Sequence, residues 1–151
     1  MKPVRRVVTG FNAAGKSCVI SDGDAPQTPA SINLWSTAPN DPLGSDPGTE
    51  NLSLELPAGG SSWRIVDVPP YTVLKEYLKH GLPGHDKDGF HCTDTVDYVI
   101  VASGDITLVL DDGEVLLHAG DCVVQRRTNH VWRNDGDQPV RIICAIVSAR
   151  H

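Results

Sequence analysis

The sequence predicts an all-β protein whose antiparallel strands close into a sandwich or barrel. Short β-prone runs recur from end to end, Gly- and Asp-containing turns separate them, and no segment shows a helical stripe over three turns. The Asp111–Gly113 turn is a strong hairpin signal of this kind. The expected strands are Arg5–Thr9, Ser17–Ser21, Ser31–Ser36, Trp63–Val68, Thr72–Leu78, Val96–Ala102, Ile106–Leu110, Glu114–Leu117, Cys122–Gln125, His130–Arg133 and Val140–Ser148.

The 151 residues suit one domain with a buried core. We expect residues 1–36 to form N-terminal strands that pack on the barrel or on a dimer partner. Residues 37–62, rich in Pro and Gly, are predicted to form a long loop, and residues 63–149 the barrel itself. A homodimer is expected, because the strand at Arg5–Thr9 would otherwise leave an open edge.

Composition narrows the range of partners. A net charge of −6 with scattered Lys and Arg argues against nucleic-acid binding, and no apolar run is long enough to span a membrane. No apolar signal core is present at the N-terminus. The four cysteines are far apart and form no CxxC pair, so we interpret them as free thiols of a cytoplasmic protein.

The segment Gly10–Ser17 matches the phosphate-loop pattern GxxxxGK[ST] letter for letter. That loop holds phosphates only when a helix follows at once and supplies backbone N–H groups. Here β-branched residues, turn formers and Pro26 follow instead. The segment is therefore predicted to be a hairpin turn, and nucleotide hydrolysis is rejected.

The residues most suited to chemistry lie between positions 91 and 130. Alternate residues of a strand share a face, so His91, Thr93, Thr95 and Asp97 point the same way, into the barrel, where His130 can join them. A buried carboxylate is costly unless it is paired or binds metal. Two imidazoles and a carboxylate leave open positions, which suits non-haem Fe(II), while Mn, Ni or Zn stay possible. The alternative is a metal-free interior in which Asp97 hydrogen-bonds a histidine.

The same residues carry a family resemblance. The run His91-x-Thr93-x-x-x-Asp97 with Gly104, and the later Gly120-Asp121, His130 and Asn134, resemble the two signatures of the cupin family. The stretches His91–Tyr98 and Gln125–Asn134 resemble its small single-domain members, the cupin-2 conserved-barrel family. The resemblance implies a cupin double-stranded β-helix, a jelly-roll-like antiparallel barrel. Thr93 stands where the family usually has a histidine, and Asp97 where it has a glutamate.

Two functions are carried forward. The first is a metal-binding cupin that acts on a small organic molecule, as a dioxygenase or isomerase-type enzyme. Its metal ligands would be His91, Asp97 and His130, with Asp97 and His130 catalytic. The second is a metal-free barrel that binds a small ligand as a sensor or accessory protein.

Further residues are assigned to the cavity or set aside. Thr93, Thr95, Gln125 and Trp132 are expected to line the substrate cavity, although core packing explains Trp132 equally well. His80 and His85 lie on the preceding loop and are expected to be solvated. His85 is the alternative candidate for an extra ligand or proton carrier, because it is nearer to the motif.

Overall fold

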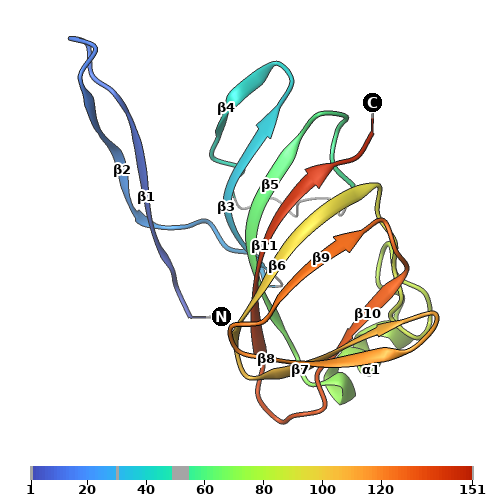
Figure 1. The fold of residues 1–151 in the computed structure, drawn as a ribbon. Helices are drawn as coiled ribbons and strands as arrows, with labels where there is room; N and C mark the ends of the chain where they lie inside the picture. The colour runs from blue at the N-terminus through green and yellow to red at the C-terminus, as the bar shows by residue number, and fades with distance from the viewer. Residues whose placement is uncertain (1, 30, 49–54, 151) are drawn as a thin grey trace.

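The computed structural model describes residues 2–29, 31–48 and 55–150. Within them lie one helix and eleven strands, drawn in Figure 1. The strands are β1 (Arg5–Phe11), β2 (Ser17–Asp24), β3 (Ser31–Ala38), β4 (Asp41–Ser45), β5 (Ser61–Val68), β6 (Thr95–Ser103), β7 (Asp105–Leu110), β8 (Glu114–His118), β9 (Cys122–Arg126), β10 (His130–Arg133) and β11 (Val140–Ser148), and the helix is α1 (Tyr71–Lys79).

Two antiparallel sheets form the body of the molecule. The larger has the strand order β4-β3-β5-β11-β6-β9 and the smaller has the order β10-β7-β8. The two sheets enclose the main hydrophobic core, to which the larger sheet contributes Val101 and Ile142 and the smaller one Ile106, Leu108 and Leu117. The predicted all-β antiparallel fold is confirmed.

The inner face of the large sheet changes character along the strands. Near one end, Ile142 on β11 pairs with Val66 on β5 and Val101 on β6, and these side chains belong to the core. Four residues further along β11, a row crosses β5, β11, β6 and β9 through Ser62, Ile146, Asp97 and Gln125. The interior is therefore apolar at one end and polar at the other.

The prediction that Thr72–Leu78 is an extended strand is wrong, because this segment lies in helix α1. Leu74 and Leu78, one turn apart, give the helix an apolar side, and Leu78 is buried. Gly81 ends the helix in the left-handed conformation, with φ of 77°, and its N–H donates to the Leu78 carbonyl at 3.1 Å. A nine-residue helix is too short to show a three-turn stripe in sequence.

The predicted loop 37–62 also differs in part. β3 continues to Ala38, β4 pairs with it through Ser36–Ser45 and Ala38–Asp41, and β5 begins at Ser61. Within β4, Asp41 Oδ1 accepts a hydrogen bond from Gly44 N–H at 3.1 Å. Residues 49–54 of this segment lie outside the described residues.

The N-terminal segment confirms the hairpin interpretation of Gly10–Ser17. β1 and β2 pair antiparallel from Arg5–Asp24 to Phe11–Ser17, and the Asn12 side chain closes the turn by accepting from the N–H groups of Ala14 and Lys16. No helix follows the motif within residues 2–29. The hairpin projects away from the two sheets (Figure 1).

The cysteines and the helix bear on two further expectations. All four cysteines lie in the described part of the chain and all are free thiols, as predicted. Among the described residues, no helix has the length and apolar character needed to cross a bilayer.

Candidate functional site

His91 and His130 form the centre of the candidate site. They lie opposite each other in an isolated antiparallel bridge, with both N–H···O distances at 3.0 Å. Their imidazole rings are 4.2 Å apart between centroids and tilted by 48°. Two histidines 39 positions apart in sequence are thus brought side by side.

The proton positions on these two rings follow from their partners. Nδ1 of His130 lies 2.9 Å from the Thr128 carbonyl oxygen, and Nδ1 of His91 lies 3.5 Å from the Gly89 carbonyl oxygen. A carbonyl oxygen only accepts, so Nδ1 carries the hydrogen in each neutral ring. The Nε2 lone pair of each ring is then left available for a ligand.

Burial keeps both rings neutral. It lowers the pKa of His91 to about 3, and the neighbouring charges of His130 and His85 act in the same direction. Burial also lowers the pKa of His130, against the opposing effects of the Thr128 carbonyl and the Asp97 carboxylate. At neutral pH both imidazoles are therefore in the form that binds a metal ion.

Asp97 lies on β6 beside two hydroxyl side chains. Thr93 Oγ1 and Thr95 Oγ1 are 2.7 Å apart. Burial raises the pKa of Asp97, and a hydrogen bond from Thr95 and the charges of His130 and Arg64 only partly oppose this. Among the described residues, Asp97 Oδ1 is a buried side-chain oxygen without a hydrogen-bond partner. The predicted pairing of Asp97 with a histidine by a hydrogen bond is not found there.

Arg64 and Cys144 are interior residues that sequence reasoning missed. Arg64 is only 5% exposed, its Nε donates to Ser62 Oγ at 3.0 Å, and it lies opposite Cys144 in the sheet. Burial lowers the pKa of Arg64, while Cys144 and Asp97 act to raise it. Burial raises the pKa of the Cys144 thiol to about 12, so the thiol stays protonated. Arg64 could have been found by its shared face with Val66 and Val68 in the predicted strand.

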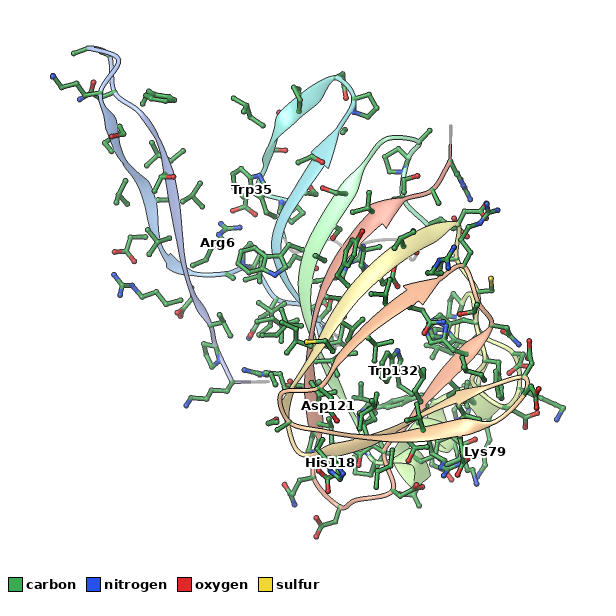
Figure 2. All side chains as sticks on the ribbon, viewed as in Figure 1. Arg6, Trp35, Lys79, His118, Asp121 and Trp132 are labelled. Atoms are coloured by element: carbon green, nitrogen blue, oxygen red, sulfur yellow. The ribbon has the colours of Figure 1, made fainter. Side chains whose placement is uncertain are left out.

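Gln125 and Trp132 complete the predicted set. Gln125 is buried and its Nε2 donates to the Thr128 carbonyl at 3.2 Å and to the Thr128 hydroxyl. Gln125 therefore fixes the same carbonyl that His130 uses, which makes it a positioning residue for that histidine. Trp132 points into the space between the sheets (Figure 2), with its ring 6.1 Å from that of His130 and perpendicular to it.

His85, expected to be solvated, lies closer to the site than the sequence indicated. Its ring centroid is 4.4 Å from that of His91, and the side chain is only partly exposed. No strand periodicity could place it, because it lies on the loop before β6.

The donor atoms of His91, His130 and Asp97 are of the chemical type that a transition-metal ion binds, but they are not arranged around a common point. Two neutral imidazoles and a buried carboxylate oxygen without a partner are the atoms such an ion prefers. Among the described residues, however, no three His, Cys, Asp or Glu side chains are positioned together as a ready metal cage. Binding would require the side chains to turn toward a common point.

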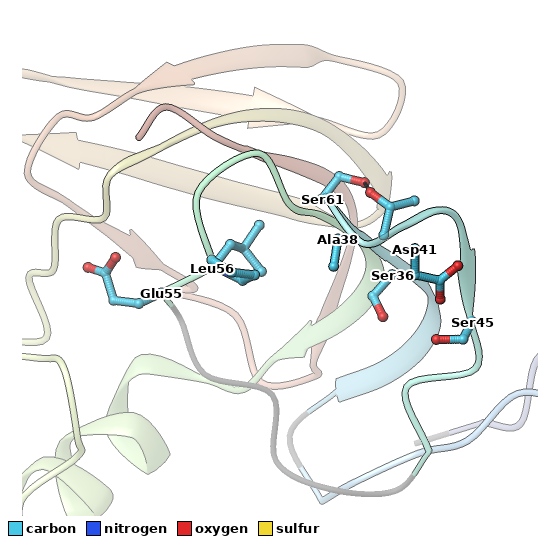
Figure 3. Close-up of a pocket in the computed structure, with 9 residues that line it drawn as sticks. Ser36, Ala38, Asp41, Ser45, Glu55, Leu56 and Ser61 are labelled. Atoms are coloured by element: carbon cyan, nitrogen blue, oxygen red, sulfur yellow. Dashed lines mark hydrogen bonds between the residues drawn. The ribbon is translucent and has the colours of Figure 1, made fainter. Parts of the chain in front are cut away.

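Two surface pockets lie away from these residues. Figure 3 shows one of about 290 Å³ beside β3, β4 and β5, where Thr37 and Ser61 are hydrogen-bonded at 2.7 Å and Asp41 and Glu55 supply carboxylates. The other, of about 390 Å³, lies beside Gly104 and Asn134. Neither lining includes His91, Asp97 or His130.

The fold and the paired histidines define a β-barrel protein with a polar site inside one end. Residues 80–146 match the family model of the cupin domain. This part of the chain is therefore similar to the cupin domain, as the two motifs indicated.

Part of the chain is also similar to individual curated proteins. The chain is 44% identical over 82 residues to Phomopsin biosynthesis cluster protein C' of Diaporthe leptostromiformis, covering 54% of this chain and 35% of that protein. It is 36% identical over 64 residues to the cupin-domain-containing oxidoreductase srdD of Neurospora crassa, covering 40% and 33% respectively. The matched part thus spans about a third of the length of these curated relatives.

Among solved structures, the chain is similar to the cupin domain of Cnp3 from Schizosaccharomyces pombe. The two are 12% identical with a TM-score of 0.49, over 97% of this chain and 83% of that chain.

Proposed function

We propose that this protein is a metal-dependent cupin that acts on a small organic molecule at the polar end of its barrel. The observation that carries the proposal is the His91–His130 pair, whose Nδ1 atoms are both directed at carbonyl oxygens and whose Nε2 atoms are left free. His91 and His130 would hold the ion, and Asp97 would be the third ligand or a general base.

Each neighbouring residue has a role in this proposal. The Asp97 carboxylate, with its unpartnered oxygen, can accept a proton from a bound molecule, since burial already favours its protonated form. The Thr93–Thr95 hydroxyl pair can orient a polar group, and Trp132 supplies an apolar wall. A bound divalent ion would supply Lewis-acid or redox chemistry at this position.

The relatives support a small-molecule substrate. One is named for a phomopsin biosynthesis cluster and another is named an oxidoreductase, so an oxidative step on a natural-product precursor agrees with both names. Fe(II) is the favoured ion on this basis, with Mn, Ni or Zn as the other candidates.

A metal-free binding barrel is the second candidate. It is favoured by the absence, within the described residues, of three side chains already positioned as metal ligands. In that case the polar end of the barrel would bind a small ligand, and the protein would serve as a sensor or accessory subunit.

Metal binding separates the two candidates. Chelator-stripped protein is titrated by calorimetry with Fe(II) under anaerobic conditions and with Mn(II), Ni(II) and Zn(II). We expect one ion per chain for the wild type and for His118→Ala, an exposed histidine paired with Asp105 away from the site. His91→Ala and His130→Ala should lose the ion. Wild-type protein that binds none of the four metals would refute the metal-dependent function.

A further inference from the structure

A third imidazole, that of His85, lies beside the His91–His130 pair at the polar end of the barrel. The His91 ring stands between the other two, 4.2 Å from that of His130 and 4.4 Å from that of His85. The tilts between successive rings are also alike, at 48° and 44°. The charge of His85 acts on both His91 and His130, so all three rings share one environment.

The three rings are oriented by the same device. His85 Nδ1 lies 3.0 Å from the Pro83 carbonyl oxygen, just as His91 and His130 use the carbonyls of Gly89 and Thr128. In each case the accepting residue precedes the histidine by two positions. Because the carbonyl fixes the hydrogen on Nδ1, His85 also has its Nε2 lone pair free.

The loop that carries His85 has an ordered local structure. Asp86 Oδ1 accepts hydrogen bonds from the N–H groups of Asp88 and Phe90, both at 2.9 Å. The Asp86 N–H donates to the Phe90 carbonyl at 2.8 Å, and Gly89 N–H donates to the Asp86 carbonyl at 3.1 Å. These bonds hold the residue next to His85 in a closed turn that leads directly to His91.

Each of the two separations that the His91 ring makes agrees with a pair of imidazoles bound to one ion. With a metal–nitrogen distance of about 2.1 Å, two rings bound at right angles have centroids roughly 4.5 Å apart. The three rings are not yet arranged as a metal site. Nowhere in the part of the chain described do three His, Cys, Asp or Glu side chains have that arrangement. His85 is partly exposed, so its ring has room to turn toward the other two.

We propose that His85 supplies a third imidazole ligand to the ion held by His91 and His130. This inference rests on the proposed function and specifies its ligand set. Three imidazoles select a transition-metal ion such as Zn(II), Ni(II) or Fe(II) over Mg(II) or Ca(II). With the third position taken by His85, Asp97 is free to exchange a proton with the bound molecule.

The test uses Zn(II) as the probe and calorimetry as the first readout. His85→Ala and His85→Gln are compared with His80→Ala, an exposed histidine on the same stretch of chain. We expect both His85 variants to bind Zn(II) roughly 100-fold more weakly than the wild type, and His80→Ala to bind like the wild type.

A second readout needs no substitution. In wild-type protein labelled with ¹⁵N, addition of Zn(II) should move the Nε2 resonance of His85 together with those of His91 and His130, and leave that of His118 unchanged. If the wild type binds Zn(II) through His91 and His130 while His85 neither shifts nor matters for affinity, this inference is wrong and the proposed function stands. If the wild type binds no metal, both are wrong.

Discussion

The Asp97 carboxylate carries a buried oxygen atom that lacks a hydrogen bond. Its Oδ1 atom is buried without a partner, and burial raises its pKa. A carboxyl group whose pKa is raised by folding destabilises the fold at pH values where it is ionised. Without a bound ion, the ionised Asp97 carboxylate therefore destabilises the fold at neutral pH.

We expect Asp97→Asn to stabilise the metal-free protein at pH 7 by about 1 kcal/mol, because the neutral amide removes a buried, poorly paired charge. The gain should shrink as pH falls through the raised pKa of Asp97 toward its ordinary value of 3.8, where the wild-type carboxyl is itself protonated. Urea unfolding with chelator present, at several pH values, measures this. A variant less stable than the wild type at pH 7 would contradict it.

At the residue scale, strand alternation predicted the position of some side chains but not others. It grouped Thr93, Thr95 and Asp97, which contact one another in turn in the structure, because those residues lie in or next to a regular strand. It failed for His85, whose position depends on a turn built around Asp86. It also gave no reason to assign Gln125 to the Thr128 carbonyl, since that bond depends on the shape of the turn before β10.

Among the elements, the turn between β6 and β7 depends on a glycine. Gly104 has φ of 74°, a left-handed conformation, and a Cβ atom there would lie 3.0 Å from Val140 Cγ2. Both the backbone conformation and the close packing of β11 against this turn exclude a larger residue.

We expect Gly104→Ala to destabilise the protein by roughly 2 kcal/mol, about half from the left-handed backbone and half from the contact with Val140. Gly81→Ala is the matched control, because Gly81 has φ of 77° and no atom within 4 Å of its virtual Cβ. That variant should lose only about 1 kcal/mol. Equal losses in urea unfolding would show that the Val140 contact has no effect.

The strands were more predictable than the helix for a physical reason. Apart from Thr72–Leu78, the expected strands occur, with ends shifted by a few residues, because their β-branched residues and flanking turns favour extended backbone. In α1, Tyr71, Thr72 and Val73 have the same β preference. The helix is favoured instead by the burial of Leu78, which depends on tertiary packing, and by Gly81, which ends the helix in the left-handed conformation.

For the whole molecule, the outer face of the large sheet carries an exposed apolar row. Trp63, Ala145, Tyr98 and Val124 lie opposite one another across β5, β11, β6 and β9. Tyr98 is 53% exposed and Val124 57%. The projecting hairpin adds further exposed apolar side chains, which are Val7, Phe11, Val19 and Ile20.

We expect the protein to form a homodimer that covers these surfaces, because contiguous exposed apolar patches mark interaction sites. Light scattering after size-exclusion chromatography should give twice the chain mass of 16.2 kDa. Val124→Asp should shift the protein toward monomer. Val115→Asp, at an exposed position on the other sheet, is the control and should leave the dimer intact. A monomeric wild type would refute the expectation.

The overall strand order could not be predicted from sequence. β11, the last strand, lies between β5 and β6, and β9 rather than β7 pairs with β6. Such pairings join segments far apart in the chain, and alternation within one strand contains no information about which partner it takes. The sequence therefore predicted the fold class, while the pairing depends on long-range packing.

Because the interior has an apolar end and a polar end, substitutions at the two ends have different consequences. Side chains such as Val101, Ile106 and Leu108 are close-packed, so almost any change there lowers stability. Ser62 and Gln125 lie in the polar row with Asp97, and under the proposed function new side chains there would alter what is recognised while the packed end keeps the barrel folded. A chain built this way can diverge in specificity with little loss of foldability, and libraries for directed evolution belong at the polar end.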